Sequence, residues 1–206
     1  RPLAARGSLS GTLVNCAGGT TPRGSWLSCE ETVTPAGHVL QRGGHSHTLA
    51  RPHGWVFEVP ARGGSDAQPL TALGQFVHEA AVVDPADGSV YLTEDQGSAG
   101  FYRLRPRTPG RLAEGGRLQM LRVRGTPDLR RGLRSGQRFD VDWVDIEHPE
   151  RGITAATGRP DGVLRQGLAQ GASVFTRLEG VFVGPGEVWF TSTNGGDAGA
   201  GQELRD

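Results

Sequence analysis

The chain has 206 residues, among them 33 glycines and 13 prolines, and its formal net charge is zero. So much glycine and proline favours short strands joined by turns over long helices, and the balanced charge argues against a nucleic-acid partner, which would need a strongly basic surface. The sequence contains no run of about 18 apolar residues, so we expect no membrane-spanning helix.

Short apolar runs separated by turn residues recur along the chain. In chain order they predict strands over 11–17, 25–34, 54–59, 80–83, 89–93, 101–104, 118–123, 139–144, 173–178, 180–183 and 187–191, with a loop or a short helix around 163–169. The segment 45–47 lies in a Gly- and Arg-rich stretch that indicates a solvated loop. Many short strands at regular spacing predict an all-β fold, namely a sandwich, a barrel or a propeller.

Two similar units carry an acidic residue at the same place. Glu79 and Glu179 are 100 positions apart, and each precedes a strand that a glycine-bearing turn joins to a strand with an aromatic residue, Tyr91 or Trp189. With propeller blades of about 40–45 residues, this separation corresponds to about two blades. Equivalent positions of different blades face one central channel, so a propeller would bring the two carboxylates together.

Six acidic residues lie at predicted strand ends, and one cysteine lies in a glycine-rich segment. They are Glu30, Glu31, Glu79, Glu94, Asp95, Glu179 and Cys16. Carboxylate oxygens suit hard cations such as Ca²⁺, and a thiolate suits iron or zinc, so this set has the chemistry of a mixed metal centre. Taken singly, each residue has a simpler explanation, such as a solvated strand end for Glu30 and Glu31 or a turn for Glu94 and Asp95.

A series of motifs relates the chain to a known family. The longest are 15–22 (NCAGGTTP) and 24–31 (GSWLSCEE), and they are followed by 53–59, 74–80, 90–95, 101–103, 175–180, 192–196 and 201–202. In content and in order, this series resembles the PhoX family of bacterial alkaline phosphatases, from about Gly11 to Gln202.

The resemblance implies a six-bladed β-propeller with iron (Fe³⁺) and calcium ions at its centre, which hydrolyses small phosphomonoesters. By motif, it implies that iron is held by the Cys16 thiolate and by the carboxylates of Glu79 and Glu179. Asp95, with Glu94, would help to hold iron and calcium together, and Glu30 or Glu31 would bind calcium.

Arg177 completes the expected catalytic group together with Cys16 and Glu179. It lies two residues before Glu179, and alternation along a strand would place both side chains on one face. The resemblance implies that its planar guanidinium group clamps phosphate oxygens. The metal ions would polarise the phosphoryl group and offset the charge of the transition state.

Several neighbouring residues have two interpretations. Cys29 is interpreted as a structural thiol, although a Cys16–Cys29 disulfide would remove the proposed iron ligand. His78 either donates a hydrogen bond behind the ligands or is a core histidine. Thr193 and Asn194 either line the site or shape a glycine turn.

The length of the chain sets the expected extent of the fold. Family members are longer, so we expect one incomplete propeller domain over residues 1–206, shortened at both ends. At about 40–45 residues per blade, 206 residues supply four to five blades. An exported, periplasmic or extracellular protein is implied by the resemblance.

Three functions remain open from the sequence. The first is a metal-dependent phosphomonoesterase. The second is a calcium-binding propeller without activity that binds a ligand or a partner. The third, another propeller hydrolase that acts through calcium, such as a lactonase, would not need a cysteine.

Overall fold

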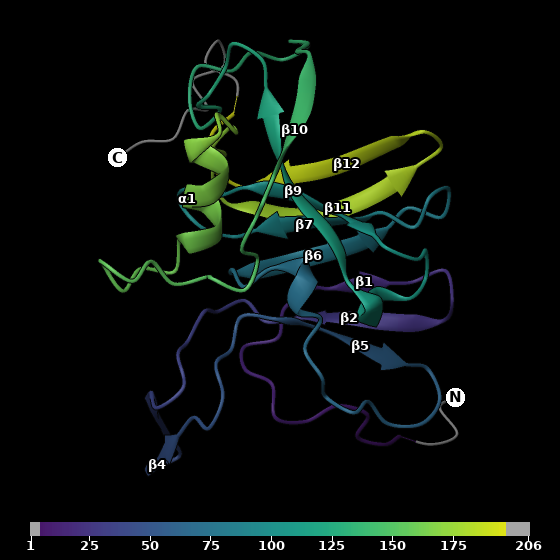
Figure 1. Ribbon diagram of the computed structural model, residues 1–206, viewed down its shortest axis with the longest axis vertical. Helices are drawn as coiled ribbons and strands as arrows, with labels where there is room; N and C mark the ends of the chain where they lie inside the picture. Colours follow the sequence, from purple (N-terminus) through teal and green to yellow (C-terminus); the bar gives the residue numbers. More distant parts are fainter. Residues whose placement is uncertain (1–4, 197–206) are drawn as a thin grey trace.

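The computed structural model describes residues 5–196, which form mainly short antiparallel strands (Figure 1). The strands are β1 (Gly19–Thr20), β2 (Ser25–Cys29), β3 (Val39–Arg42), β4 (His45–Thr48), β5 (Val56–Pro60), β6 (His78–Val83), β7 (Val90–Glu94), β8 (Phe101–Pro106), β9 (Gly116–Val123), β10 (Val141–Asp145), β11 (Leu178–Gly184) and β12 (Glu187–Ser192). They form four sheets, with strand orders β1-β2-β5, β10-β9-β8-β7-β6, β11-β12 and β3-β4. The expected all-β fold is confirmed.

Most of the predicted elements form, including the short helix, which is α1 (Gly162–Ala169). Two 3₁₀ turns, Thr71–Leu73 and Leu112–Glu114, lie in connections. Within the part of the chain that the structure describes, no helix is long and apolar enough to cross a membrane.

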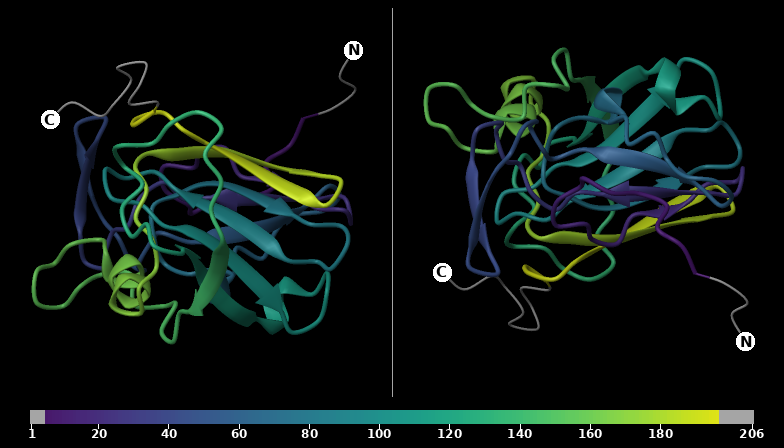
Figure 2. Two further views of the ribbon diagram at one scale, coloured as in Figure 1. Left: turned by 90° about the horizontal axis from the view of Figure 1, so that it is seen from above. Right: turned by 90° about the horizontal axis from the view of Figure 1, so that it is seen from below.

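Two predicted strands do not form as expected, because their backbone groups bond to residues that are distant in sequence. Segment 11–17 forms no strand, and most of segment 173–178 makes only isolated pairings, such as Ala99 with Phe175. Segment 45–47 was predicted as a loop but lies in β4, which pairs with β3; β4 is exposed along its whole length, so no alternation of apolar and polar residues marks it. This hairpin projects away from the other sheets (Figure 2).

The other three sheets follow one another, with β6 lying between β1 and β11 (Figure 1). Gly18 pairs with Ala80 of β6. A first core cluster packs between the β1-β2-β5 sheet, the five-stranded sheet and α1, around Leu27, Tyr102 and Met120. A second core cluster joins the five-stranded sheet to β11–β12, where the rings of Phe101 and Phe190 stack 4.1 Å apart.

Three such sheets are fewer than the four to five blades that the length allows. The middle sheet alone takes five strands, and residues 146–177 contribute α1 and connecting segments but no strand. The residues between Glu79 and Glu179 are taken up by the five-stranded sheet, α1 and the connecting segments. The two carboxylates therefore lie in neighbouring sheets, whereas their separation in sequence had suggested a distance of two blades.

A β-bulge occurs at the same place in two hairpins. In β6–β7, His78 pairs with Glu94 and Ala81 with Leu92, so Glu79 and Ala80 together oppose one residue. In β11–β12, Leu178 pairs with Ser192 and Val181 with Phe190, which leaves a second bulge at Glu179. The predicted equivalence of the two units is therefore confirmed. Bulges redirect side chains, and they are common beside active sites.

Candidate metal centre

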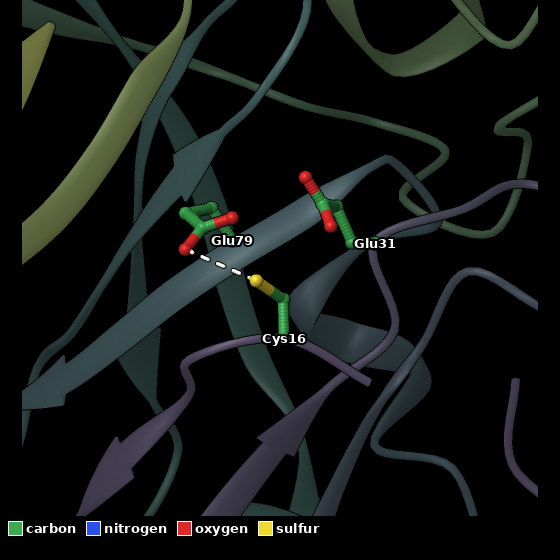
Figure 3. Close-up of side chains that lie close together, drawn as sticks. All are labelled: Cys16, Glu31 and Glu79. Carbon is green, nitrogen blue, oxygen red and sulfur yellow. Dashed lines mark hydrogen bonds between the residues drawn. The ribbon is translucent and has the colours of Figure 1, made fainter. Parts of the chain in front are cut away.

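Five of the predicted ligands converge where the three sheets meet. Ligand atoms of Cys16, Glu31 and Glu79 lie within 4.8 Å of one another, and so do those of Glu79, Asp95 and Glu179. Figure 3 shows the first group, with the side chains of Cys16, Glu31 and Glu79 directed toward one another. Because Glu79 belongs to both groups, its carboxylate links the two halves of one site.

The segment that carries Cys16 is fixed to β2 and β6 by its backbone. The Cys16 amide donates to the carbonyl of Cys29 over 2.9 Å, and the Gly18 amide donates to the carbonyl of Glu79 over 3.0 Å. Gly18 has a φ of +66°, and a Cβ atom there would lie 2.0 Å from the carbonyl oxygen of Leu27. Only glycine permits this close approach, which places Cys16 over Glu79.

The Cys16 thiol donates a hydrogen bond to Glu79 Oε1 over 3.2 Å (Figure 3). Loss of hydration, this hydrogen bond and the charge of Glu79 raise the pKa of Cys16 to about 12. The thiol therefore carries its proton at neutral pH unless a nearby cation stabilises the thiolate. A metal ion at this position would supply that positive charge.

Thr93 holds both bulges. Its fully buried hydroxyl accepts from the Ala80 amide over 3.1 Å and donates to the carbonyl of Glu179 over 2.5 Å. The hydroxyl thereby connects the bulge of Glu79 to the bulge of Glu179. Thr93 lies within the motif 90–95, but no local pattern indicates its role, because its partners are brought to it by the packing of two sheets.

Asp95, one residue beyond β7, presents a buried acceptor that lacks a hydrogen bond. Its side chain is 7% exposed, and its Oδ1 atom accepts no hydrogen bond, although Arg177 Nε lies 3.1 Å away as an ion pair. Burial and the charge of Glu179 raise the pKa of Asp95 to about 6, against the opposing effect of Arg177. An under-bonded carboxylate among other carboxylates fits a bound cation.

Burial and mutual repulsion disfavour the charged forms of the carboxylates in this group. Burial, together with the charges of Glu179 and Asp95, raises the pKa of Glu79 above its ordinary value. Clustered carboxylates that resist ionisation are stabilised by a cation between them. The donor set, one thiol and four carboxylates, therefore fits both a hard cation and a metal that accepts sulfur.

Arg177 lies at the outer side of this group, with its side chain 43% exposed. Its Nη2 atom donates to Glu179 Oε1 over 2.8 Å, and Thr193 Oγ1 donates to the same oxygen over 2.9 Å. Arg177 precedes β11 and has a φ of +47°, a conformation that is costly for a residue with a side chain. Its proximity to Glu179 thus results from this backbone conformation and not from strand alternation.

Glu30, predicted as a calcium ligand, lies in neither group and has another role. Its fully buried carboxylate accepts from His53 Nδ1 over 2.6 Å and from the amides of Leu13, Gly54 and Trp55 over 2.8, 2.7 and 3.1 Å. Four donors occupy both oxygens. Glu30 therefore anchors the segment that leads to Cys16, while its neighbour Glu31 points to the site.

Glu94 also lies in neither group, although it was predicted beside Asp95. Its fully buried carboxylate accepts from the Gly100 amide over 2.8 Å, from Tyr102 Oη over 2.9 Å and from Gln96 Nε2 over 3.0 Å. Burial raises the pKa of Glu94 to about 7. These bonds connect β7 to β8 in the interior of the sheet.

Burial decides between the two interpretations of Cys29 and of His78. Both cysteines are free, and Cys29 is fully buried in the first core cluster, as expected for a structural thiol. His78 is fully buried, with Nε2 2.9 Å from the carbonyl oxygen of Gly74 and its ring 3.7 Å from that of Phe76. Burial lowers the pKa of His78 to about 4, so it is a neutral core histidine.

The fold and the site together define a class, namely all-β proteins in which successive blade-like sheets gather a thiol, several carboxylates and an arginine. The sequence model of the family "Alkaline phosphatase PhoX" matches residues 4–204, and this chain belongs to the PhoX family. No curated protein matches the chain.

A solved structure with the same fold is that of Pseudomonas fluorescens PhoX in complex with vanadate, a transition state analogue. The TM-score is 0.58 and the sequence identity 24%, over 90% of this chain and 40% of that one. The expected β-propeller fold is therefore confirmed, and the chain spans about two fifths of the length of this relative.

Proposed function

We propose that this chain contributes the metal centre of a phosphatase that hydrolyses phosphate monoesters. The observation that carries the proposal is the convergence of Cys16, Glu31, Glu79, Asp95 and Glu179 with Arg177 at their outer side. Membership in the PhoX family supports it. In this proposal Cys16, Glu79 and Glu179 hold iron, while Glu31 and Asp95 bind calcium.

The bound cations would supply Lewis-acid polarisation of the phosphoryl oxygens and offset their developing charge. The chain itself supplies an anion-binding group, because the guanidinium of Arg177 presents several N–H donors in one plane. In this structure the guanidinium bonds to Glu179 and Thr193 at the rim of the site. Substrate oxygens would meet Arg177 on its exposed side.

We further propose that the three sheets belong to one incomplete propeller domain and that the protein acts outside the cytoplasm. Export is typical of the PhoX family. The substrate would be a small phosphomonoester, as membership in the family of phosphatases suggests.

A second candidate is a calcium-binding propeller that binds a partner without catalysis. The observation that favours it is a cross-strand pair of aromatic residues on β11–β12, Phe182 and Trp189, which are 67% and 61% exposed. Exposed apolar surface of this kind is typical of interaction sites. The two candidates differ in the need for Cys16, because a calcium site requires no thiolate.

Elemental analysis of the purified protein, paired with hydrolysis of a chromogenic phosphomonoester at alkaline pH, separates these functions. We expect iron and calcium with turnover, and loss of iron and turnover in Cys16→Ala. Cys29→Ala is the matched control, because it removes the buried thiol outside the site and should retain both metals. Calcium without turnover would favour the second candidate, and a protein without bound metal would contradict the site.

A further inference from the structure

Arg177 and a bound cation would use the same carboxylates. The guanidinium contacts Asp95 Oδ1 through Nε at 3.1 Å and Glu179 Oε1 through Nη2 at 2.8 Å. Asp95 and Glu179 are also two of the three residues that gather with Glu79 as a candidate cation site. One positive group of the protein therefore competes for the oxygens that a cation would need.

The contact with Asp95 leaves the carboxylate open to a better partner. Although Arg177 Nε lies 3.1 Å from Asp95 Oδ1, this buried oxygen accepts no hydrogen bond. The Asp95 side chain is 7% exposed and that of Arg177 43% exposed, so the carboxylate lies inside and the guanidinium at the rim. A divalent cation could approach more closely, and it would repel the guanidinium.

The backbone of Arg177 is held by hydrogen bonds to other backbone groups, whereas its head group lies at the exposed rim and contacts the side chains of Asp95, Glu179 and Thr193. Its amide donates to the carbonyl of Gln96 over 2.7 Å, and its carbonyl accepts from the Thr193 amide over 3.0 Å. These two bonds maintain the left-handed backbone, with a φ of +47°. A change in position would therefore be a rotation of the side chain alone, away from Asp95 and toward solvent.

We propose that Arg177 and the cation are alternative partners of Asp95 and Glu179, so that cation binding releases the guanidinium to bind a tetrahedral oxyanion such as phosphate. This inference rests on the proposed metal centre. It makes anion binding depend on cation binding, because the guanidinium pairs with protein carboxylates until a cation takes its place. It also explains why an arginine lies within an acidic group.

The first test is calcium affinity in protein that has been treated with a chelator. Arg177→Gln removes the competing charge and should tighten calcium binding about tenfold, as measured by titration calorimetry. Arg177→Lys keeps the charge and should bind calcium more like the unmodified chain. The control, Arg124→Gln, removes an equal charge from a surface pair with Asp142 and should leave calcium affinity unchanged.

The second test uses inorganic phosphate as the probe of the calcium-loaded protein. Arg177→Gln should weaken phosphate binding about tenfold, even though it strengthens calcium binding. A residue that only stabilised the fold would lower both affinities together. Denaturation of Arg177→Gln in urea establishes that the variant is folded.

The outcomes separate this inference from the proposed function. If the unmodified chain binds calcium and Arg177→Gln binds it equally or more weakly, the competition does not exist, but the metal centre stands. If the unmodified chain binds neither calcium nor iron, the proposed function fails, and this inference fails with it.

Discussion

Glu30 and Glu31 are adjacent in sequence, but the fold gives them opposite environments. Glu30 is fully buried and its two oxygens accept four hydrogen bonds, whereas Glu31 is partly exposed and faces Cys16 and Glu79. Neighbouring side chains of an extended segment point to opposite sides. One carboxylate therefore serves the structure, and the next serves the site.

Glu30→Gln should destabilise the fold by about 2–4 kcal/mol, because the new amide group faces N–H donors where an acceptor is required. Unfolding in urea, with a chelator present, measures the effect. Glu31→Gln is the matched control and should retain the free energy of unfolding but bind less calcium. Loss of metal without loss of stability in Glu30→Gln would instead make Glu30 a ligand.

Glu94 should make stability depend on pH. Its pKa is raised to about 7 from an ordinary value of 4.5 by burial, so the folded state holds the proton more tightly than the unfolded state. The contribution is present below the unfolded pKa and is lost as the pH rises through the folded pKa. The free energy of unfolding of the chelated protein should therefore fall between about pH 4.5 and 7.

Glu94→Gln should remove this part of the pH dependence. The amide oxygen can still accept from the Gly100 amide and from Tyr102, both of which bond to Oε2. Urea unfolding of both proteins at pH 5 and at pH 8 compares the two slopes. Parallel pH profiles would show that Glu94 does not titrate in this range.

At the level of strands, the two bulges set the direction of the ligands. In both hairpins the pairing register shifts at the second residue of the first strand. Glu79 of β6 and Glu179 of β11 therefore depart from the regular alternation of side chains between the two faces of the sheet. Thr93 of β7 bonds to the backbone of both bulged segments. The site thus depends on an element that carries no ligand itself.

Thr93→Val preserves the shape of the side chain but leaves the Ala80 amide and the Glu179 carbonyl without a partner. We expect a loss of about 2 kcal/mol in the free energy of unfolding and weaker calcium binding. Thr93→Ser keeps the hydroxyl and should restore calcium affinity. Thr191→Val, at an exposed position of β12, is the control; an equal effect there would exclude a specific role for Thr93.

For the molecule as a whole, the site joins three sheets. Cys16 follows the segment anchored by Glu30, whereas Glu79 is the second residue of β6 and Glu179 the second residue of β11. A cation that binds only to the folded chain stabilises it in proportion to its occupancy. A cation bound at the proposed site would therefore make the stability of the three-sheet arrangement depend on metal.

Calcium should raise the melting temperature of the chelated protein. At a concentration 100 times Kd, the gain is about 2.7 kcal/mol, which corresponds to about 5–10 °C for a chain of this size. Differential scanning calorimetry measures the shift, and Glu31→Gln, which removes a proposed calcium ligand, should reduce it. Glu187→Gln, at an exposed position of β12, should show the full shift, and no shift in the unmodified chain would exclude calcium.

Local patterns were sufficient for most of the strands and for the types of ligand. The hairpins around 84–88 and 184–186 were predicted because turn residues and apolar runs are adjacent in sequence. The equivalence of Glu79 and Glu179 followed from the same pattern. Segment 11–17 was predicted wrongly as a strand, because its amides bond to residues such as Glu30 that are distant in sequence.

The sequence by itself determined the all-β class, the likeness to the PhoX family and the set of residues from which the proposed metal centre is built, because these depend on residue types and local order. Only the tertiary structure decided which member of each acidic pair faces the site, Glu31 over Glu30 and Asp95 over Glu94. That choice depends on strand register and on donors from other strands, which local sequence does not encode.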